Sequence, residues 1–265
     1  MKTHYEITGE GKPIIFIHGA FISSQMWNPQ ILHFSKNYRV ITYDLRGHGL
    51  TGPSAPDNYS IELFVSDLKN LIDEIIPGQK PIVCGLSLGG MIAQAYAVKY
   101  KNDINCLILC DTLATLSLST TNKIMYRLFP KSMVVLFLRL LGVKTFIKFA
   151  YWMAGNLKGK KWLKNKKIIK YTKQEMLNQQ AEEWLKTMKA VYDLKKPDLK
   201  EIKAPTLILL GEYEGKPFYN NAALLLNEIQ GAKIKIISDA GHLPNLENPR
   251  EFNNTVSPFI KDACP

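Results

Sequence analysis

The sequence has few cysteines and no pattern in them that is typical of a metal site. Four cysteines occur among 265 residues, and no two of them form a Cys-x-x-Cys pair. Three of them, Cys84, Cys106 and Cys110, lie inside apolar runs, and the fourth is Cys264. We therefore expect reduced core thiols in a cytoplasmic protein.

Targeting segments and cofactor motifs are also missing. The apolar runs are interrupted before they reach the roughly 20 residues of a membrane-spanning helix, so none is expected. Residues 1–20 lack the charged, apolar and small-residue order of a signal peptide, so none is expected either. Neither a metal-ligand cluster nor the glycine fingerprint of a dinucleotide site occurs, and we expect no metal and no cofactor.

The charge is concentrated in one segment. The chain carries a net charge of +11, from 34 Lys+Arg and 23 Asp+Glu. Residues 123–203 hold 20 basic and 6 acidic residues, a net of +14, and the remaining 14 and 17 give −3. Such an excess attracts nucleic acid, an anionic membrane or an acidic ligand, or only keeps a surface solvated. No nucleic-acid recognition motif accompanies it, so nucleic-acid binding is not expected.

Short apolar runs alternate with helical patterns on either side of that segment. Continuous apolar runs are typical of strands that are buried on both faces of a parallel sheet. The runs are Ile14–Ile17, Val40–Tyr43, Ile82–Cys84, Leu107–Cys110, Leu207–Leu210 and Ile234–Ile237. Helical patterns such as Ile61–Ile76 and Met91–Tyr100 separate them, and this alternation predicts an α/β domain.

The strand pattern stops after Asp111 and resumes only at Pro205, and the interval is helical in character. An interruption of this kind between two strands is typical of an inserted subdomain. We expect a core domain formed by residues 1–118 and 203–265, with an inserted helical cap at residues 119–202. The basic excess belongs to this cap.

The strongest motif is Gly85-Leu86-Ser87-Leu88-Gly89, which lies between an expected strand and an expected helix. Gly-x-Ser-x-Gly in that context is typical of a nucleophile elbow, a tight turn that projects the serine hydroxyl. The flanking glycines leave room for the neighbouring strand and helix. Because the turn opens a helix, backbone N–H groups would face an oxyanion that develops at Ser87. A chance match of five residues is the alternative interpretation.

A second motif, His18-Gly19-Ala20-Phe21, follows the first apolar run. The N–H of Ala20, together with that of Leu88, is a candidate oxyanion hole, and Phe21 is the substitute for Ala20. A third motif, Asp239-Ala240-Gly241-His242, follows the last run and offers His242 as general base. A plain turn and a structural histidine are the alternatives, but His242 follows Ser87 in the chain order that such a triad has.

With these motifs the chain resembles the α/β-hydrolase superfamily over nearly its whole length. The matching stretches are IIFIHGAF, YDLRGHGLTGPS, CGLSLGGMIAQAYA, PTLILLGEYE and ISDAGHLPNLENPREFNNTV. It is most similar to small esterases, enol-lactonases and carbon–carbon bond hydrolases. The resemblance implies an eight-stranded, mostly parallel sheet flanked by helices, with a cap between the sixth and seventh strand–helix units. It also implies Ser87 as nucleophile, His242 as base, and Ala20 and Leu88 as oxyanion donors.

The acidic residue of the triad departs from the family pattern. The family has Gly-x-x-Asp after the seventh strand, and here Gly211-Glu212-Tyr213-Glu214 places glutamate at that position. Glu214 can orient and charge-balance an imidazole as aspartate does. Asp111 is a second candidate, because some hydrolases place the acid after the sixth strand. Chain position favours Glu214.

The apolar stretch Met133–Met153 of the expected cap has two interpretations. It either covers the active site, or it forms a lipid-surface or acyl-chain site in which Leu, Phe and Trp lie beside Arg139, Lys144 and Lys148. The run Lys158–Lys173 adds eight lysines in sixteen residues. Its simplest interpretation is a solvated face, and the alternative is electrostatic binding of nucleic acid, which no recognition motif supports. For the basic cap as a whole, weak contact with a membrane surface is a further interpretation.

Together these features predict a cofactor-independent serine hydrolase that cleaves a carboxylic ester or lactone through an acyl-enzyme. The serine at the elbow argues against dehalogenase or epoxide hydrolase chemistry, which uses aspartate there in this fold. The expected partner is a small hydrophobic substrate, in contact with Phe21. A carbon–carbon bond hydrolase with the same three residues, and a hydrolase-fold receptor with little turnover, are the alternatives.

Overall fold

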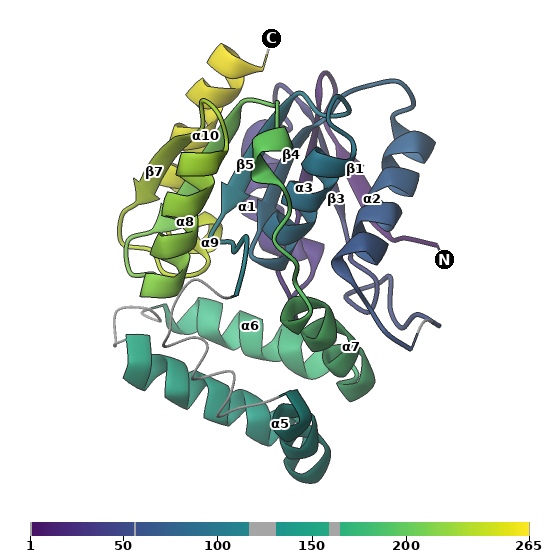
Figure 1. Cartoon of the computed structure of the whole chain (residues 1–265), viewed down its shortest axis with the longest axis vertical. Helices are drawn as coiled ribbons and strands as arrows, with labels where there is room; N and C mark the ends of the chain where they lie inside the picture. Colours follow the sequence, from purple (N-terminus) through teal and green to yellow (C-terminus); the bar gives the residue numbers. More distant parts are fainter. Residues whose placement is uncertain (1, 56, 117–130, 159–164, 265) are drawn as a thin grey trace.

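A computed structural model describes residues 2–55, 57–116, 131–158 and 165–264, and within them one sheet of seven strands is flanked by helices on both faces (Figure 1). Its strand order is β1-β3-β2-β4-β5-β6-β7, and only β1 pairs antiparallel with its neighbour. The strands are β1 (Tyr5–Thr8), β2 (Pro13–Ile17), β3 (Arg39–Tyr43), β4 (Ile82–Leu86), β5 (Cys106–Cys110), β6 (Thr206–Gly211) and β7 (Lys233–Ile237). The predicted α/β class is confirmed.

Side chains of the buried strands point alternately to the two faces of the sheet and belong to two hydrophobic clusters, one on each face. Ile15 and Ile17 of β2 pack on the face that α2, α3 and α8 cover, and Ile14 and Phe16 pack on the face that α1 and α10 cover. The helices of the core are α1 (Asn28–Phe34), α2 (Ile61–Ile75), α3 (Leu88–Lys99), α8 (Lys216–Glu228), α9 (Pro244–Glu247) and α10 (Pro249–Ala263), with short 3-10 turns η1 (Ser24–Trp27) and η2 (Leu199–Glu201). The strands are therefore buried on both faces, as their apolar runs predict.

The implied number of eight strands is wrong for the described residues, which form seven. The six apolar runs are all strands, β2 to β7. The seventh strand, β1, has four exposed residues and lies at the edge of the sheet. It therefore has no apolar run from which a strand could be predicted. Backbone pairing with β3, rather than burial of side chains, holds it in place.

A helical insertion lies between β5 and β6. It comprises residues 131–158 and 165–192, with α5 (Lys131–Lys158), α6 (Lys166–Asn178) and α7 (Ala181–Tyr192). All three helices lie beyond one end of the sheet, and α5 is the farthest from it (Figure 1). The expected cap boundary at residue 118 and part of the lysine run, residues 159–164, fall outside the described residues. In the part of the chain that is described, no helix combines the length and the apolar character needed to cross a bilayer.

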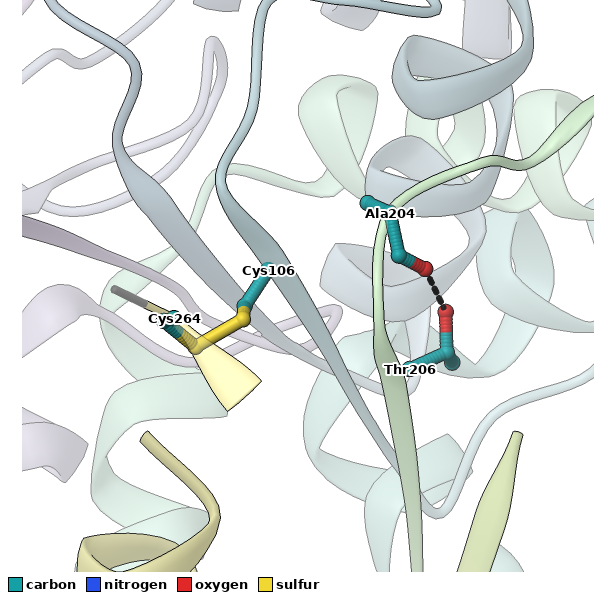
Figure 2. The surroundings of a disulfide bond; sticks show 4 residues. All are labelled: Cys106, Ala204, Thr206 and Cys264. Carbon is teal, nitrogen blue, oxygen red and sulfur yellow. Dashed lines mark hydrogen bonds between the residues drawn. A yellow bond between two sulfur atoms is a disulfide. The ribbon is translucent and has the colours of Figure 1, made fainter. Parts of the chain in front are cut away.

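The expectation of reduced thiols is wrong for two of the four cysteines. Cys106 at the start of β5 and Cys264 just after α10 form a disulfide, with Cα atoms 5.8 Å apart (Figure 2). They are separated by 158 positions in the chain, so only the packing of α10 against the sheet brings them together. Cys84 and Cys110 are free and buried. Because disulfides are rare in the cytoplasm, cysteine usage no longer supports the expected location.

Candidate active site

Ser87 lies on a sharp turn between β4 and α3. Its φ is +53°, a left-handed conformation that is strained for any residue except glycine. The flanking glycines are required: a Cβ on Gly85 would lie 2.3 Å from the Gly89 carbonyl oxygen, and one on Gly89 would lie 2.2 Å from that of Ile17. The turn is held from outside, because the Ser87 N–H donates to the Cys110 carbonyl oxygen at 2.9 Å. The motif thus has the geometry of a nucleophile elbow.

A threonine that the sequence did not single out also holds this turn. Thr112 Oγ1 donates to the Ser87 carbonyl oxygen at 2.7 Å. Ser87 is therefore fixed on its N–H side by the last residue of β5 and on its carbonyl side by the segment that follows β5. Nothing in the local sequence around Thr112 marks this role, because the contact depends on the pairing of β4 with β5.

His242 is oriented by a buried carboxylate. Its Nδ1 lies 2.5 Å from Glu214 Oε1, and the Glu214 side chain has no exposed surface. The second oxygen, Oε2, accepts the Gly215 N–H at 2.8 Å. With its proton on Nδ1 toward this acceptor, the neutral imidazole has its lone pair on Nε2. The ring is thereby in the state that a general base needs.

The second acid candidate, Asp111, contacts the backbone of another strand. It is fully buried with a φ of +38°, and its Oδ1 accepts the Gly211 N–H at 3.0 Å. This bond ties the end of β5 to the end of β6, just before the loop that carries Glu214. Glu214, the candidate that chain position favours, lies at hydrogen-bond distance from Nδ1 of His242.

Glu247, at the end of α9, clamps the loop of the histidine. Its Oε2 accepts the N–H of Gly241 at 2.9 Å and its Oε1 accepts that of Leu243 at 3.1 Å, so one carboxylate binds the backbone on both sides of His242. Burial raises the pKa of Glu247. This residue was missed in the sequence, although it lies five positions after His242 within one of the stretches that carry the family resemblance.

A cavity of about 180 Å³ brings these residues together with the helical insertion. From the core, Gly19, Ala20, Ile22, Leu86, Ser87, His242, Leu243 and Glu247 line it. From the insertion, Tyr151, Asn165, Ile168, Ile169, Thr172 and Met176 line it. No lysine or arginine of the described residues is part of this lining. The cavity is thus small, and its insertion side combines apolar residues with Tyr151 and Thr172, whose hydroxyl oxygens lie 2.5 Å apart.

The two expected oxyanion donors lie close to Ser87 in different ways. Ala20 lines the same cavity as Ser87. Leu88 is the first residue of α3, where backbone N–H groups have no acceptor within the helix. Both therefore lie beside Ser87, where the sequence predicts oxyanion donors.

Phe21 lies elsewhere. Its ring stacks on Trp184 of α7, with centroids 3.8 Å apart, and it lines a second, more polar cavity of about 350 Å³. That larger cavity includes neither Ser87 nor His242 in its lining. Since the reactive side chains share the smaller cavity, we place the candidate active site there. Phe21 instead links the loop after β2 to the insertion.

The comparisons with known proteins agree with this geometry. Residues 14–255 match the model of the alpha/beta hydrolase family, and the chain therefore belongs to this family of hydrolases.

Among proteins similar to this chain is 3-oxoadipate enol-lactonase 2 of Acinetobacter baylyi, 24% identical over 94% of this chain and 88% of the relative. The structure of MenH from S. aureus has a TM-score of 0.86 and 28% identity, and the match covers 99% of each chain. A thermophilic esterase from Thermogutta terrifontis has a TM-score of 0.83 and 25% identity over 99% of this chain and 94% of the other. At such identities the named activities of the relatives differ, so the substrate has to be argued from the cavity.

Proposed function

We propose that the protein is a serine hydrolase of small, uncharged carboxylic esters or lactones, with Ser87 as nucleophile, His242 as base and Glu214 as the acid that orients it. The observation that carries the proposal is the pairing of His242 Nδ1 with the buried Glu214 carboxylate beside a cavity that Ser87 shares. The relatives named enol-lactonase and esterase support an ester or lactone bond as the one cleaved.

The reaction follows from the roles of these groups. Ser87 Oγ attacks the carbonyl carbon while Nε2 of His242 takes its proton, and Glu214 stabilises the imidazolium that results. The N–H groups of Ala20 and Leu88 donate to the tetrahedral oxyanion. The imidazolium then protonates the leaving alkoxide, and the acyl group remains on Ser87. Water attacks this ester with His242 again as base, the acid departs, and Ser87 regains its proton.

The cavity favours a small neutral substrate. Its volume of about 180 Å³ lies below the range that is usual for sites of drug-sized ligands. A substrate carboxylate would find no cationic side chain among the described lining residues, and an unpaired buried charge is strongly unfavourable. Ile168, Ile169 and Met176 instead offer apolar contact to an acyl group.

The test is the variant Ser87→Ala, assayed with nitrophenyl acetate and labelled with a fluorophosphonate. We expect kcat to fall by about 10³-fold or more and labelling to disappear, because the nucleophile is gone. Ser238→Ala, which removes an exposed serine on the loop after β7, is the matched control and keeps both. Undiminished turnover and labelling in Ser87→Ala would overturn the proposal, and turnover of a vinylogous diketone but of no ester would assign carbon–carbon bond hydrolysis instead.

A further inference from the structure

The exposed face of α5 spans two helical parts that meet at a kink at Gly142, whose φ of 74° and ψ of 161° are not helical. Twelve large hydrophobic residues are exposed in the described part of the chain, and five of them belong to these two parts. They are Met133, Leu136, Leu140, Leu141 and Trp152. Leu140 is 72% exposed and Trp152 is 64% exposed. Exposed apolar clusters of this kind are typical of surfaces that bind another protein or a membrane.

The opposite face of α5 already has its partners within the protein. Leu138 and Ile147 are buried, and Phe146 packs edge-on against Trp184 of α7, with centroids 5.8 Å apart. The helix is therefore apolar on both sides, which is typical of a helix that is covered all round. In Figure 1, α5 is the element farthest from the sheet and α6 lies between the two.

The exposed lysines of α5, and the composition of the sequence around them, identify what would cover this face. Residues 131–174 contain twelve Lys and Arg and no Asp or Glu. On α5 the exposed Lys144 and Lys148 precede the exposed Trp152 at four-residue spacing, so the three lie along one side of the helix. A second copy of the same face would bring these cations together, and like charges in contact oppose association. A partner with an apolar interior and a negatively charged boundary would match both the exposed apolar side chains and the lysines beside them.

We propose that this face of α5 docks on an anionic phospholipid surface. Leu136, Leu140 and Trp152 enter the boundary between headgroups and acyl chains, and Lys144 and Lys148 lie among the anionic headgroups. Tyr151, the neighbour of Trp152, lines the cavity that holds Ser87. Docking would thus bring the insertion side of the cavity close to the membrane, although the binding itself does not depend on hydrolysis.

The experiment is flotation of the full chain with phosphatidylcholine vesicles that contain or lack phosphatidylserine. We expect flotation with the serine lipid and about tenfold less without it, because each lysine near an anionic surface adds to the affinity. The double variants Leu140→Ser/Trp152→Ser and Lys144→Glu/Lys148→Glu should each reduce flotation by about tenfold or more. Both should hydrolyse a soluble short ester as the parent does, which shows that they fold.

Matched controls come from the core. Leu32→Ser alters a leucine that is 74% exposed on α1, and Lys233→Glu/Lys235→Glu reverses two exposed lysines on β7. Both controls should float as the parent does. The proposal is overturned if the parent does not bind the anionic vesicles, or if the α5 variants bind as well as the controls. It is also overturned if sedimentation shows a dimer that Leu140→Ser/Trp152→Ser dissociates, since a second copy then covers the face.

Discussion

In the core, hydrogen bonds hold Ser87 and His242 beside the cavity, whereas three of the six insertion residues that line it, Ile168, Ile169 and Met176, are apolar. The Ser87 backbone is fixed by the Cys110 carbonyl and the Thr112 hydroxyl. His242 is held by Glu214, and its loop by Glu247. On the insertion side, Tyr151 OH and Thr172 Oγ1 lie within hydrogen-bond distance of each other, and Asn165 Oδ1 accepts the Lys167 N–H. The comparison suggests that the core sets the reaction and the insertion sets which substrate enters. The predictions below test that division.

The largest effect should follow from removing the charge that orients His242. In Glu214→Gln we expect kcat to fall by about 10³- to 10⁴-fold, because the imidazolium loses its buried counter-charge and the amide no longer fixes the tautomer. Asp111→Asn is the matched change, since its amide oxygen can still accept the Gly211 N–H. Steady-state kinetics on nitrophenyl acetate compare the two, and a large loss in Asp111→Asn alone would assign the acid to Asp111.

A second change tests the stability of the core rather than its chemistry. Cys264→Ser opens a disulfide that closes a loop across 158 positions, and we expect the free energy of unfolding to fall by about 2 to 5 kcal/mol. Denaturant unfolding with and without a reductant measures it. The parent should lose stability on reduction and the variant should not. Equal stability of the two oxidised proteins would show that the bond adds nothing.

The clamp on the histidine loop should give an intermediate effect. In Glu247→Gln, one acceptor is replaced by an amide donor that faces an N–H, so His242 shifts and kcat falls by about 10- to 100-fold, with KM little changed. Hydrolysis by Glu247→Asp, which keeps the charge, should exceed that by Glu247→Gln. An unchanged kcat in Glu247→Gln would show that Glu247 does not position His242.

Glu247 should also change how the free energy of unfolding depends on pH, and Glu247→Gln should remove this dependence. Burial raises the pKa of Glu247 above its ordinary value of 4.5, so the folded protein keeps a proton that the unfolded chain releases. Its contribution to stability is complete below pH 4.5 and is lost as the pH rises through the raised pKa. The free energy of unfolding of the parent should therefore fall over that window relative to Glu247→Gln. Parallel curves would contradict the shift.

How much could be predicted from sequence differs between the two regions for a physical reason. In the core, the elbow around Ser87 is recognisable in the sequence because steric contact at positions 85 and 89 excludes every residue except glycine. The strands are recognisable because burial on both faces requires apolar runs. The clamp by Glu247, the disulfide and the edge strand β1 depend on contacts between distant segments, and no local pattern encodes them. In the insertion, an apolar stretch indicates a helix but not whether its side chain faces Ser87 or solvent.

Selectivity should respond to the insertion while turnover of the smallest substrate does not. Ile168→Ala shortens a side chain of α6 that lines the cavity and so enlarges the cavity. We expect the ratio of kcat/KM for nitrophenyl octanoate to kcat/KM for nitrophenyl acetate to rise about tenfold, which is the size of effect that a few methylene contacts give. Leu177→Ala on the same helix changes an exposed leucine that does not line the cavity, and it should leave the ratio unchanged. If both variants shift it alike, the insertion acts through helix stability and not through contact with the acyl group.

The smallest expected effect concerns the distribution of net charge, which is +14 in residues 123–203 and −3 in the rest of the chain. Since no cation of the described residues lines the cavity, these charges act on a substrate only through solvent, where about 0.1 M salt screens beyond about 10 Å. We expect kcat/KM for a soluble anionic ester to fall about twofold as salt is added, and that for a neutral ester to stay constant. Lys144→Glu/Lys148→Glu should flatten the first curve. A flat response in the parent would mean that the basic insertion plays no part in substrate approach, which leaves the lipid surface as the partner for its charge.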